Sequence, residues 1–299
     1  MSATYAGSGG PYPVHVRARA VVAAGSAVET PALLLRSGVR GAAGRGLHLH
    51  PTAALLAEYD RPIRNWVGPM QTVAVRRFTR RDPGVHGPWF EAAPAHPGLS
   101  ALATPWRGSD AHKAEMRRVA RAAATIVLVR DHGAGRVRID PEGNPELEYR
   151  LDRRDRENLS FGLSEAARIH HAAGALRIAT LHTRPIAVGD GRTPITSAEL
   201  EDLQEAILRE GVRENALALF SAHPTGSAHA GVDPRSATAR PTGEVHGVDG
   251  LWIGDGSLLP TAPGVNPMIA IMALAERTAD YLLASLGGSR PAQIAAVKP

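Results

Sequence analysis

The sequence predicts a mixed α/β fold in which α/β segments at both ends of the chain bracket an antiparallel middle. Two observations predict the outer, discontinuous domain. Residues 14–26, "VHVRARAVVAAGS", pass from alternating to continuously apolar before a glycine turn, as a strand entering a buried sheet does, and the helix-like "ETPALLLRSGV" follows. After Val212 the same glycine-rich, apolar character returns. A third observation, a series of short strand-like runs between these ends, predicts the antiparallel middle.

Cap residues indicate where the outer helices begin and end. In "ETPALLLRSGV", Thr30 suits the N-cap and Gly38 the end of a short helix. Residues 250–257, "GLWIGDGS", are typical of a buried strand that ends in a tight turn. Residues 264–288, "GVNPMIAIMALAERTADYLLASLGG", predict a complete helix, with Asn266 as its N-cap and Pro267 at its first position. Its helically spaced apolar residues have the pattern of a core face: Met268, Met272, Ala275, Ala279 and Leu282.

The middle segment combines short strands with two long helices. "TIVLVRD", "GRVRID" and "PELEYRL" are typical of strands joined by turns, which predicts an antiparallel meander. One helix is expected from near Asp152 to a stop at Gly174, and another from a capping box made by Thr196 and Glu199. We therefore expect residues 1–50 and 216–299 to form the α/β domain and residues 51–215 the inserted antiparallel domain.

The composition excludes several classes of protein. The chain has 299 residues, 43% of them hydrophobic, no cysteine and a formal net charge of +5. The absence of cysteine removes disulfides, thiolate nucleophiles and cysteine metal sites. Arginines alternate with acids, as in "LDRRDREN", which indicates solvated faces rather than a nucleic-acid-binding stripe. No apolar run reaches the length of a membrane span and residues 1–20 lack the apolar stretch of a signal peptide, so we expect a cytoplasmic location.

Three stretches in the last quarter carry side chains suited to chemistry: "SAHPTGSAHAG" (221–231), "GDGS" (254–257) and "GVNPM" (264–268). His223 lies among small residues that leave room for a substrate, and the ordinary pKa of an imidazole suits a general base. His48 and His50 have the spacing of metal ligands on a strand, but no further ligands accompany them, so no metal site is expected. A serine hydrolase is not expected, because the chain has no Gly-x-Ser-x-Gly.

In order and spacing, "HPTGSAHAG", "VHGVDGLWIGDGSLLPT" and "GVNPMIAIMALAERTADYL" resemble the C-terminal signature of the glucose-methanol-choline (GMC) family of FAD-dependent oxidoreductases. "AVVAAGSAVETPALLLRSGV" is similar to the second signature of this family, and "GRGLHLHPT" to its Gly-x-Asn-Leu-x-x-His segment. "LHLHP" and the antiparallel middle most resemble the long-chain alcohol oxidase branch. The resemblance implies part of a three-layer FAD-binding domain with an inserted antiparallel-sheet, substrate-binding domain.

The resemblance also assigns roles to residues of this chain. His223 matches the active-site histidine that takes the hydroxyl proton of an alcohol while the carbinol hydride goes to flavin N5. Asn266 matches the second active-site position, and its uncharged amide suits a hydrogen bond to the substrate oxygen. The substrate class implied is a small, apolar alcohol.

Four more residues match positions at the cofactor. Asp255 and Gly256 match a turn that contacts the ribityl and pyrophosphate region of FAD, where glycine permits close backbone approach. Pro267 and Met268 match the start of the helix beside the flavin N1/O2 edge. Because proline has no N–H group, Met268 would be the first backbone donor there. A helix N-terminus also stabilises the negative charge of a reduced flavin.

The chain departs from the family pattern at its N-terminal end. Members begin with a strand, a Gly-x-Gly-x-x-Gly turn and a helix that hold the FAD pyrophosphate, and no segment here matches this fingerprint. Gly46 stands where Asn is usual, and "GSAVETP" carries one residue more than the usual turn. We therefore expect the C-terminal portion of a longer enzyme, or a subunit that needs an N-terminal FAD-binding partner. The alternative is a catalytically incompetent remnant that keeps the fold.

Overall fold

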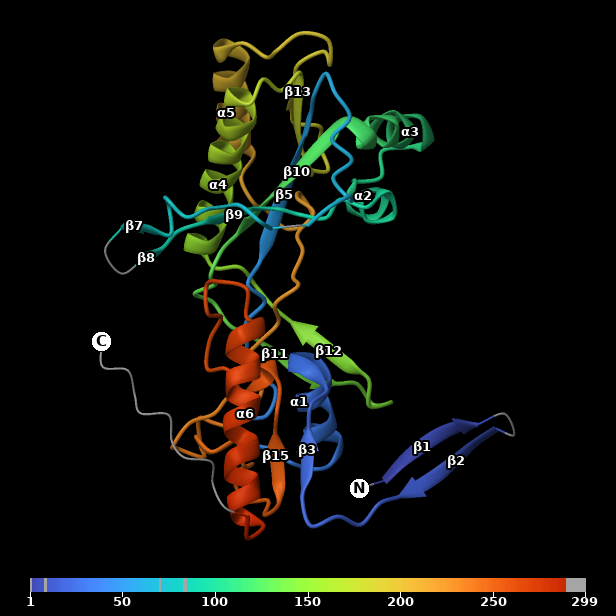
Figure 1. Ribbon diagram of the computed structural model, residues 1–299, viewed down its shortest axis with the longest axis vertical. Coiled ribbons are helices and arrows are strands. Elements are labelled where there is room, and N and C mark those ends of the chain that lie inside the picture. The colour runs from blue at the N-terminus through green and yellow to red at the C-terminus, as the bar shows by residue number, and fades with distance from the viewer. Residues whose placement is uncertain (1, 8–9, 70, 83–84, 289–299) are drawn as a thin grey trace. The chain divides into compact units, whose positions relative to one another are not determined.

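The computed structural model describes residues 2–7, 10–69, 71–82 and 85–288 and shows a mixed α/β chain with several sheets (Figure 1). The described residues fall into two compact units. Unit 1 comprises those of 1–48, 134–150 and 223–299, and unit 2 comprises those of 49–133 and 151–222. This division differs from the predicted ranges, chiefly because residues 134–150 carry two strands of unit 1. No helix in the described part of the chain is both long and apolar enough to cross a bilayer.

Unit 1 is built from short strands that pair over long sequence distances. β3 (Val21–Ala23) pairs in parallel with β15 (Leu251–Ile253), as the predicted α/β character requires. β11 (Gly135–Ile139) is the central strand of a three-stranded antiparallel sheet, between β12 (Pro145–Glu148) and β4 (Arg45–Leu47). A separate antiparallel hairpin is formed by β1 (Ser2–Gly7) and β2 (Gly10–His15).

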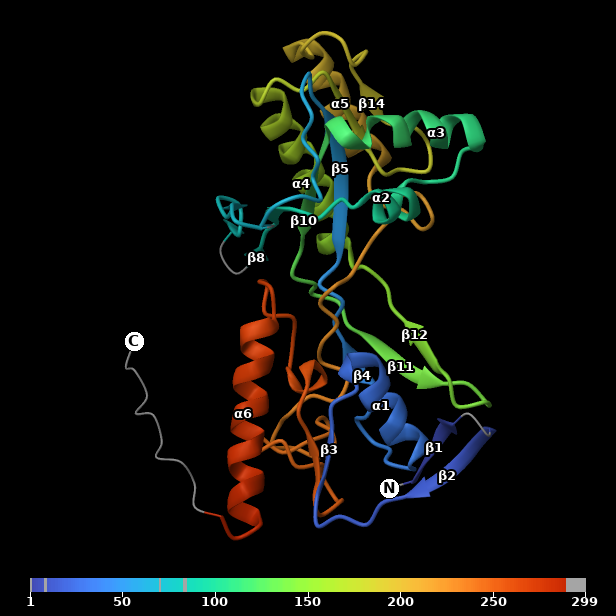
Figure 2. The ribbon, with the colours of Figure 1, turned by 45° about the vertical axis from the view of Figure 1, so that its right-hand side comes forward.

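Two helices flank the β3–β15 pair in unit 1. α1 (Ser26–Arg36) contacts β11 and the 3₁₀ turn η2 (Gly256–Leu258), whereas α6 (Met268–Ser285) contacts β15. Figure 2 shows α6 on one side of β3, with α1 and β11 on the other, so unit 1 has the layers of an α/β domain. Its small core includes Leu34, Ile253 and Leu258.

The start of α1 differs from the prediction. The helix begins at Ser26 with Gly25 as the N-cap, which lies five residues before the predicted cap Thr30. Thr30 is completely buried inside the helix, where its hydroxyl accepts a hydrogen bond from Gly25 N at 2.8 Å. Ser26 has φ = 75°, a left-handed conformation that is uncommon for a residue with a side chain. The glycine and serine therefore form a turn that the capping rule for Thr30 does not describe.

For α6, the structure differs from the prediction in the N-cap residue and in the face of the helix that is buried. Its N-cap is Pro267 rather than Asn266, and Gly287 follows its C-terminus with φ = 86°, as expected for a terminating glycine. Much of the predicted core stripe faces outward instead: Met268 is 65% and Met272 60% exposed, and Ala279 is exposed too, whereas Ala275 and Leu282 are half-buried. Because this helix is apolar almost all round, spacing alone does not show which face is buried.

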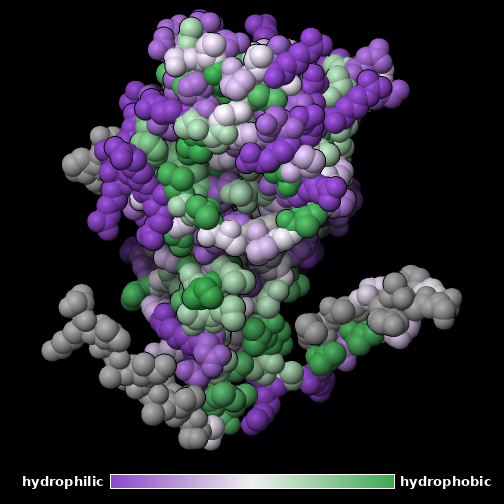
Figure 3. Space-filling view, turned by 45° about the horizontal axis from the view of Figure 1, so that its top comes forward, coloured by the Kyte–Doolittle hydropathy of each residue, from purple (hydrophilic) through white to green (hydrophobic). Residues whose placement is uncertain are grey.

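A different stripe of α6 docks on unit 1. Thr278 is buried against Gly243, where an added Cβ would lie 2.3 Å from the Thr278 hydroxyl oxygen. Leu274 packs on the core cluster that contains Ile253. The opposite face of α6 is an exposed apolar surface, and Figure 3 shows green hydrophobic residues gathered on the part of the molecule that carries this helix.

Unit 2 is an antiparallel sheet of six strands covered by helices. The strand order is β14-β13-β5-β10-β9-β6. The strands are β5 (Thr52–Glu58), β6 (Ala74–Val75), β9 (Trp89–Ala92), β10 (Ala122–Leu128), β13 (Arg177–Thr180) and β14 (Ala187–Val188), with a further pair, β7 (Arg80–Asp82) and β8 (Val85–His86), outside this sheet. The predicted meander is confirmed only for its last two strands, because β11 and β12 form an antiparallel pair in unit 1 whereas β10 pairs with β5 and β9 in unit 2.

Unit 2 contains four α-helices in its described residues, and the two long ones begin at the caps predicted for them. The four helices are α2 (Pro97–Ala103), α3 (Ser109–Arg118) with the 3₁₀ turn η1 (Val119–Arg121), α4 (Arg153–Ala172) and α5 (Ser197–Glu210). Asp152 caps α4, Gly174 follows its end with φ = 77°, and the capping box of Thr196 and Glu199 is present at α5. Gly162 lets α4 approach the sheet, because an added Cβ would lie 2.2 Å from Val127.

Substitution by glutamine should affect stability differently on the exposed and the docked face of α6. Met272→Gln places an amide on the exposed face and should change the free energy of unfolding by less than about 0.5 kcal/mol. Leu274→Gln places it against the core and should cost about 1–3 kcal/mol. Urea unfolding of the two variants measures both effects. Equal losses would contradict the assignment of the faces.

His170 predicts a pH dependence of stability. It lies in the core of unit 2, where its Nδ1 and the Tyr59 hydroxyl are 2.7 Å apart, and burial lowers its pKa from 6.5 to about 4. Between about pH 6.5 and pH 4 the unfolded chain therefore binds a proton that the folded chain does not, so acidification destabilises the fold by up to about 1.4 kcal/mol per pH unit.

The variant His170→Gln removes this titration. On going from about pH 7 to about pH 5, the wild type should lose about 2 kcal/mol more of its unfolding free energy than the variant does. Urea unfolding at the two pH values gives this difference directly, and all other titrating groups are common to both proteins. The same loss in both would show that His170 is not the group responsible.

Candidate functional site

The stretch after His223 forms a ladder of hydrogen bonds along η2 in unit 1. Gly226 N donates to Gly256 O at 3.2 Å, Ala228 N to Ser257 O at 3.0 Å and Ala230 N to Leu258 O at 3.0 Å. Two of the three segments that the sequence singled out for chemistry, "SAHPTGSAHAG" and "GDGS", are therefore neighbours in space.

The stretch after His223 also forms backbone hydrogen bonds with the segment "GRGLHLHPT". His48 and Thr225 exchange backbone hydrogen bonds at 2.9 and 2.8 Å. Gly226 has φ = 89°, and an added Cβ there would lie 2.3 Å from Gly46 O. Gly46 is also left-handed, with φ = 80°, and the Nδ1 of His229 lies 3.2 Å from the position of its missing Cβ. The absence of side chains at these two glycines thus allows the two backbones to pack closely.

Asp255 connects this ladder to the start of α1. Its Oδ1 accepts from Ser257 N at 2.8 Å, and its Oδ2 accepts from Ser26 N at 2.9 Å and from the Thr30 hydroxyl at 2.5 Å. Both oxygens of this buried carboxylate therefore have protein donors. The side chain holds the left-handed turn at Ser26 against η2. Sequence reasoning did not assign Thr30 this role, although a hydroxyl within the apolar run "ETPALLL" was a signal.

Gly256 brings the start of α6 to the same place. An added Cβ at Gly256 would lie 3.0 Å from Ile271 Cδ1 in the first turn of α6 and 3.4 Å from Pro224 O. His223 immediately precedes Pro224, and Asn266 immediately precedes the N-cap Pro267; both side chains are half-buried. Pro267 is buried, whereas Met268 is exposed. The contacts of Gly256 thus join the segments that carry the two predicted catalytic residues.

This region contains polar atoms that suit a ligand. The N-cap residue of α6, Pro267, has no side-chain acceptor to offer the first N–H groups of the helix. The hydroxyl oxygens of Thr225 and Ser257 are buried, and neither has a hydrogen-bond partner in the described part of the protein. Unsatisfied buried hydroxyls are costly and call for an explanation. A bound ligand with an anionic, hydrogen-bonding group at the N-terminal end of α6 would explain them.

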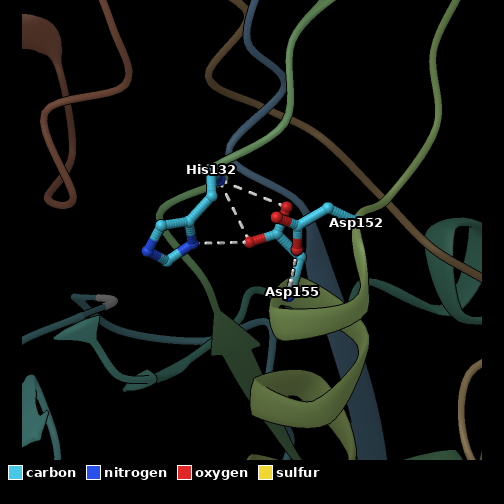
Figure 4. A group of neighbouring side chains, drawn as sticks. All are labelled: His132, Asp152 and Asp155. Carbon is cyan, nitrogen blue, oxygen red and sulfur yellow. Dashed lines mark hydrogen bonds and ion pairs between the residues drawn. The ribbon is translucent and has the colours of Figure 1, made fainter.

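A second polar cluster, in unit 2, consists of His132, Asp152 and Asp155, whose ligand-type atoms lie within 4.8 Å of one another (Figure 4). Asp155 is completely buried and accepts from His132 N at 3.1 Å and from His132 Nδ1 at 3.0 Å. Asp152 accepts from Asp155 N at 2.7 Å as the N-cap of α4. These hydrogen bonds make the cluster a cap that ties residues 132–133 to α4, and we assign it no metal.

Comparison with known proteins identifies the family to which these segments belong. Two family models described as GMC oxidoreductase match the chain, an N-terminal one over residues 6–52 and a C-terminal one over residues 131–275. The chain belongs to the GMC oxidoreductase family. The two matches include the four segments that meet around Gly226 and Gly256.

Relatives of this GMC oxidoreductase chain are considerably longer. An uncharacterized GMC-type oxidoreductase of Mycobacterium tuberculosis is 35% identical over 277 residues, which cover 92% of this chain and 41% of that protein. A long-chain-alcohol oxidase of Arabidopsis thaliana is 32% identical over 272 residues, which cover 87% of this chain and 36% of that protein. The chain thus spans about two fifths of the length of the curated relatives it matches.

Solved structures share the fold. Pyridoxine 4-oxidase from Mesorbium loti matches with a TM-score of 0.57 and 20% identity, over 93% of this chain and 53% of that one. Formate oxidase from Aspergillus oryzae matches with a TM-score of 0.60 and 15% identity, over 94% of this chain and 57% of that one. The predicted mixed α/β fold is therefore confirmed.

The Asp255 contacts predict how Thr30 affects the stability of the GMC chain. Thr30→Val keeps the volume of the side chain but removes the hydroxyl, so Gly25 N loses its acceptor and Asp255 loses a donor. We expect a loss of about 1–3 kcal/mol in the free energy of unfolding. Thr30→Ser keeps the hydroxyl and is the matched control. If urea unfolding showed the valine variant to be as stable as the serine variant, the hydroxyl would have no such role.

Proposed function

We propose that this chain carries the catalytic histidine and part of the flavin site of an FAD-dependent oxidoreductase that acts on the CH–OH group of apolar alcohols. The observation that carries the proposal is the meeting of the four family segments in unit 1 through contacts of Gly226 and Gly256. Relatives named long-chain-alcohol oxidases support an apolar alcohol as the substrate.

The residues at the start of α6 fit the cofactor. The N–H groups of the first turn, beginning at Met268, suit the electron-rich N1/O2 edge of a flavin. The orphaned hydroxyls of Thr225 and Ser257 are further hydrogen-bonding groups for a ligand with many polar atoms. Asp255 has both oxygens engaged, so its role is to position the turn, and Gly256 offers the close approach.

Two side chains of this chain would then act on the alcohol. FAD, when bound, supplies the acceptor for the hydride that leaves the carbinol carbon. The imidazole of His223 accepts the hydroxyl proton as a general base. The amide of Asn266 donates a hydrogen bond to the substrate oxygen and fixes its orientation, which requires no change in the charge of the amide.

We propose further that residues beyond this chain complete the FAD site, in the same or in another polypeptide. The sequence has no strand followed by Gly-x-Gly-x-x-Gly and a helix, which is the common means of holding a dinucleotide pyrophosphate. The curated relatives are more than twice as long. An N-terminal segment of the kind that these relatives carry would supply the missing contacts.

Complementation tests this proposal. The purified chain is mixed with FAD and the N-terminal portion of the Mycobacterium tuberculosis relative, and bound flavin absorbance and oxidation of a long-chain alcohol are measured. His223→Ala should keep flavin absorbance and lower kcat by about 10²- to 10⁴-fold, the usual contribution of a general base. Asn266→Ala should lower kcat/KM by about 10- to 100-fold.

His246→Ala is the control, because this histidine binds the backbone of Gly231 instead of lying beside Gly256. It should retain turnover. Bound flavin without turnover in the wild-type mixture would favour the incompetent remnant. Turnover that survives His223→Ala would overturn the catalytic assignment.

A further inference from the structure

Unit 2 has a groove whose lining is strongly basic. Its volume is about 710 Å³, and it lies among the first turns of α4, the end of α5 and β7. Five arginines and a single carboxylate residue, Glu157, line it. The basic lining residues are Arg81, Arg153, Arg154, Arg156 and Arg213.

Three of these cations are not neutralised by neighbouring acids. Arg153 pairs with Glu157 at 3.1 Å, and Arg213 pairs with Glu210. Within the described ranges, Arg81, Arg154 and Arg156 have no carboxylate at ion-pair distance. This excess of positive charge is concentrated at the N-terminal end of α4, where the helix dipole adds to it. The groove therefore attracts an anion with more than one negative charge.

The groove also has an apolar and aromatic part. The Arg81 guanidinium lies over the Phe161 ring, 4.0 Å from its centre, and Phe161 packs edge-on against Phe78 with ring centres 5.3 Å apart. The stacked guanidinium is thereby held in place while its N–H groups remain available. Leu208 and Val212 complete the apolar lining. A ligand that fits has an apolar or aromatic portion beside its charged group.

We propose that this groove binds an organic phosphate, that is, a ligand with a phosphate group attached to an aromatic or alkyl portion. A phosphate dianion matches the guanidinium fork in two-point hydrogen bonding and balances several arginines, whereas one carboxylate would leave most of them unpaired. The volume suits a molecule of the size of a nucleotide. The site shares no residue with the FAD site proposed for unit 1.

Two phosphate probes distinguish the sources of such a ligand. ADP represents nucleotides and dodecyl phosphate represents lipid-like phosphates; adenosine and dodecanol are their phosphate-free counterparts. Calorimetric titration of the whole chain should show binding of at least one phosphate probe and much weaker binding of its counterpart. The affinity should fall as salt is added, because the arginines interact with charge.

Substitution of the two arginines on α4 that have no carboxylate partner locates the binding. The double variant Arg154→Gln/Arg156→Gln should bind the probe at least tenfold more weakly. Both side chains are exposed, so the variant should keep the circular dichroism spectrum and melting temperature of the wild type. Arg209→Gln, also exposed but on α5 outside the groove, should bind like the wild type.

Each pattern of probe binding either supports or contradicts the proposed organic phosphate site. Binding of ADP alone identifies a nucleotide-type ligand, and binding of dodecyl phosphate alone identifies an alkyl phosphate. If neither phosphate bound, or if the double variant bound as tightly as the wild type, the groove would not be an organic phosphate site. Binding of adenosine as tight as that of ADP would likewise overturn the proposal, since the arginines would then contribute nothing.

Discussion

The arrangement of unit 1 depends on the carboxylate of Asp255. This buried group accepts hydrogen bonds from a backbone N–H of η2, from Ser26 at the start of α1 and from the Thr30 hydroxyl inside α1. A buried carboxylate is tolerated only when such donors compensate its lost hydration. Because the same η2 turn carries the ladder to residues 226–230, the position of α1 and that of the stretch after His223 are coupled.

The two faces of α6 differ in what they contact. One face fits tightly, through Thr278 against Gly243 and Ile271 against Gly256. The other exposes Met268, Ile269 and Met272, and a contiguous apolar surface of this kind is typical of a contact with further protein or ligand. The end of the helix nearest the candidate site is also its uncapped end. The docked face therefore fixes the direction of the N–H groups in the first turn of α6.

Sequence reasoning succeeded where local chemistry determines the structure. The cap of α4 at Asp152, the capping box at Thr196 and the tight turn after β15 each depend on a few neighbouring residues, and the structure has all three. The family assignment likewise followed from short, ordered segments. The roles predicted at the substrate and the cofactor stay predictions for all six residues: His223, Asn266, Asp255, Gly256, Pro267 and Met268.

The incorrect or missing predictions concern features that depend on residues far apart in the sequence. The pairing of β10 with β5 rather than β11 depends on chain topology, which strand composition does not encode. Thr30 resembled an N-cap because its true partner, Asp255, is far away in the sequence. The basic groove was also missed, because its arginines come from β7, α4 and the residues after α5, and the same arginines looked like solvated faces when read along the chain.

The pairing of β3 with β15 has a consequence for how the chain acquires its fold during synthesis. Val21 and its partner Leu251 are separated by more than two hundred residues, so Val21 leaves the ribosome well before Leu251. All of unit 2 is made in between, so the apolar strand β3 cannot pair with β15 until unit 2 has been synthesised. Pairings between such distant segments form slowly and leave exposed strand edges in the meantime. The parallel pair that organises unit 1 is therefore formed late relative to the fold of unit 2.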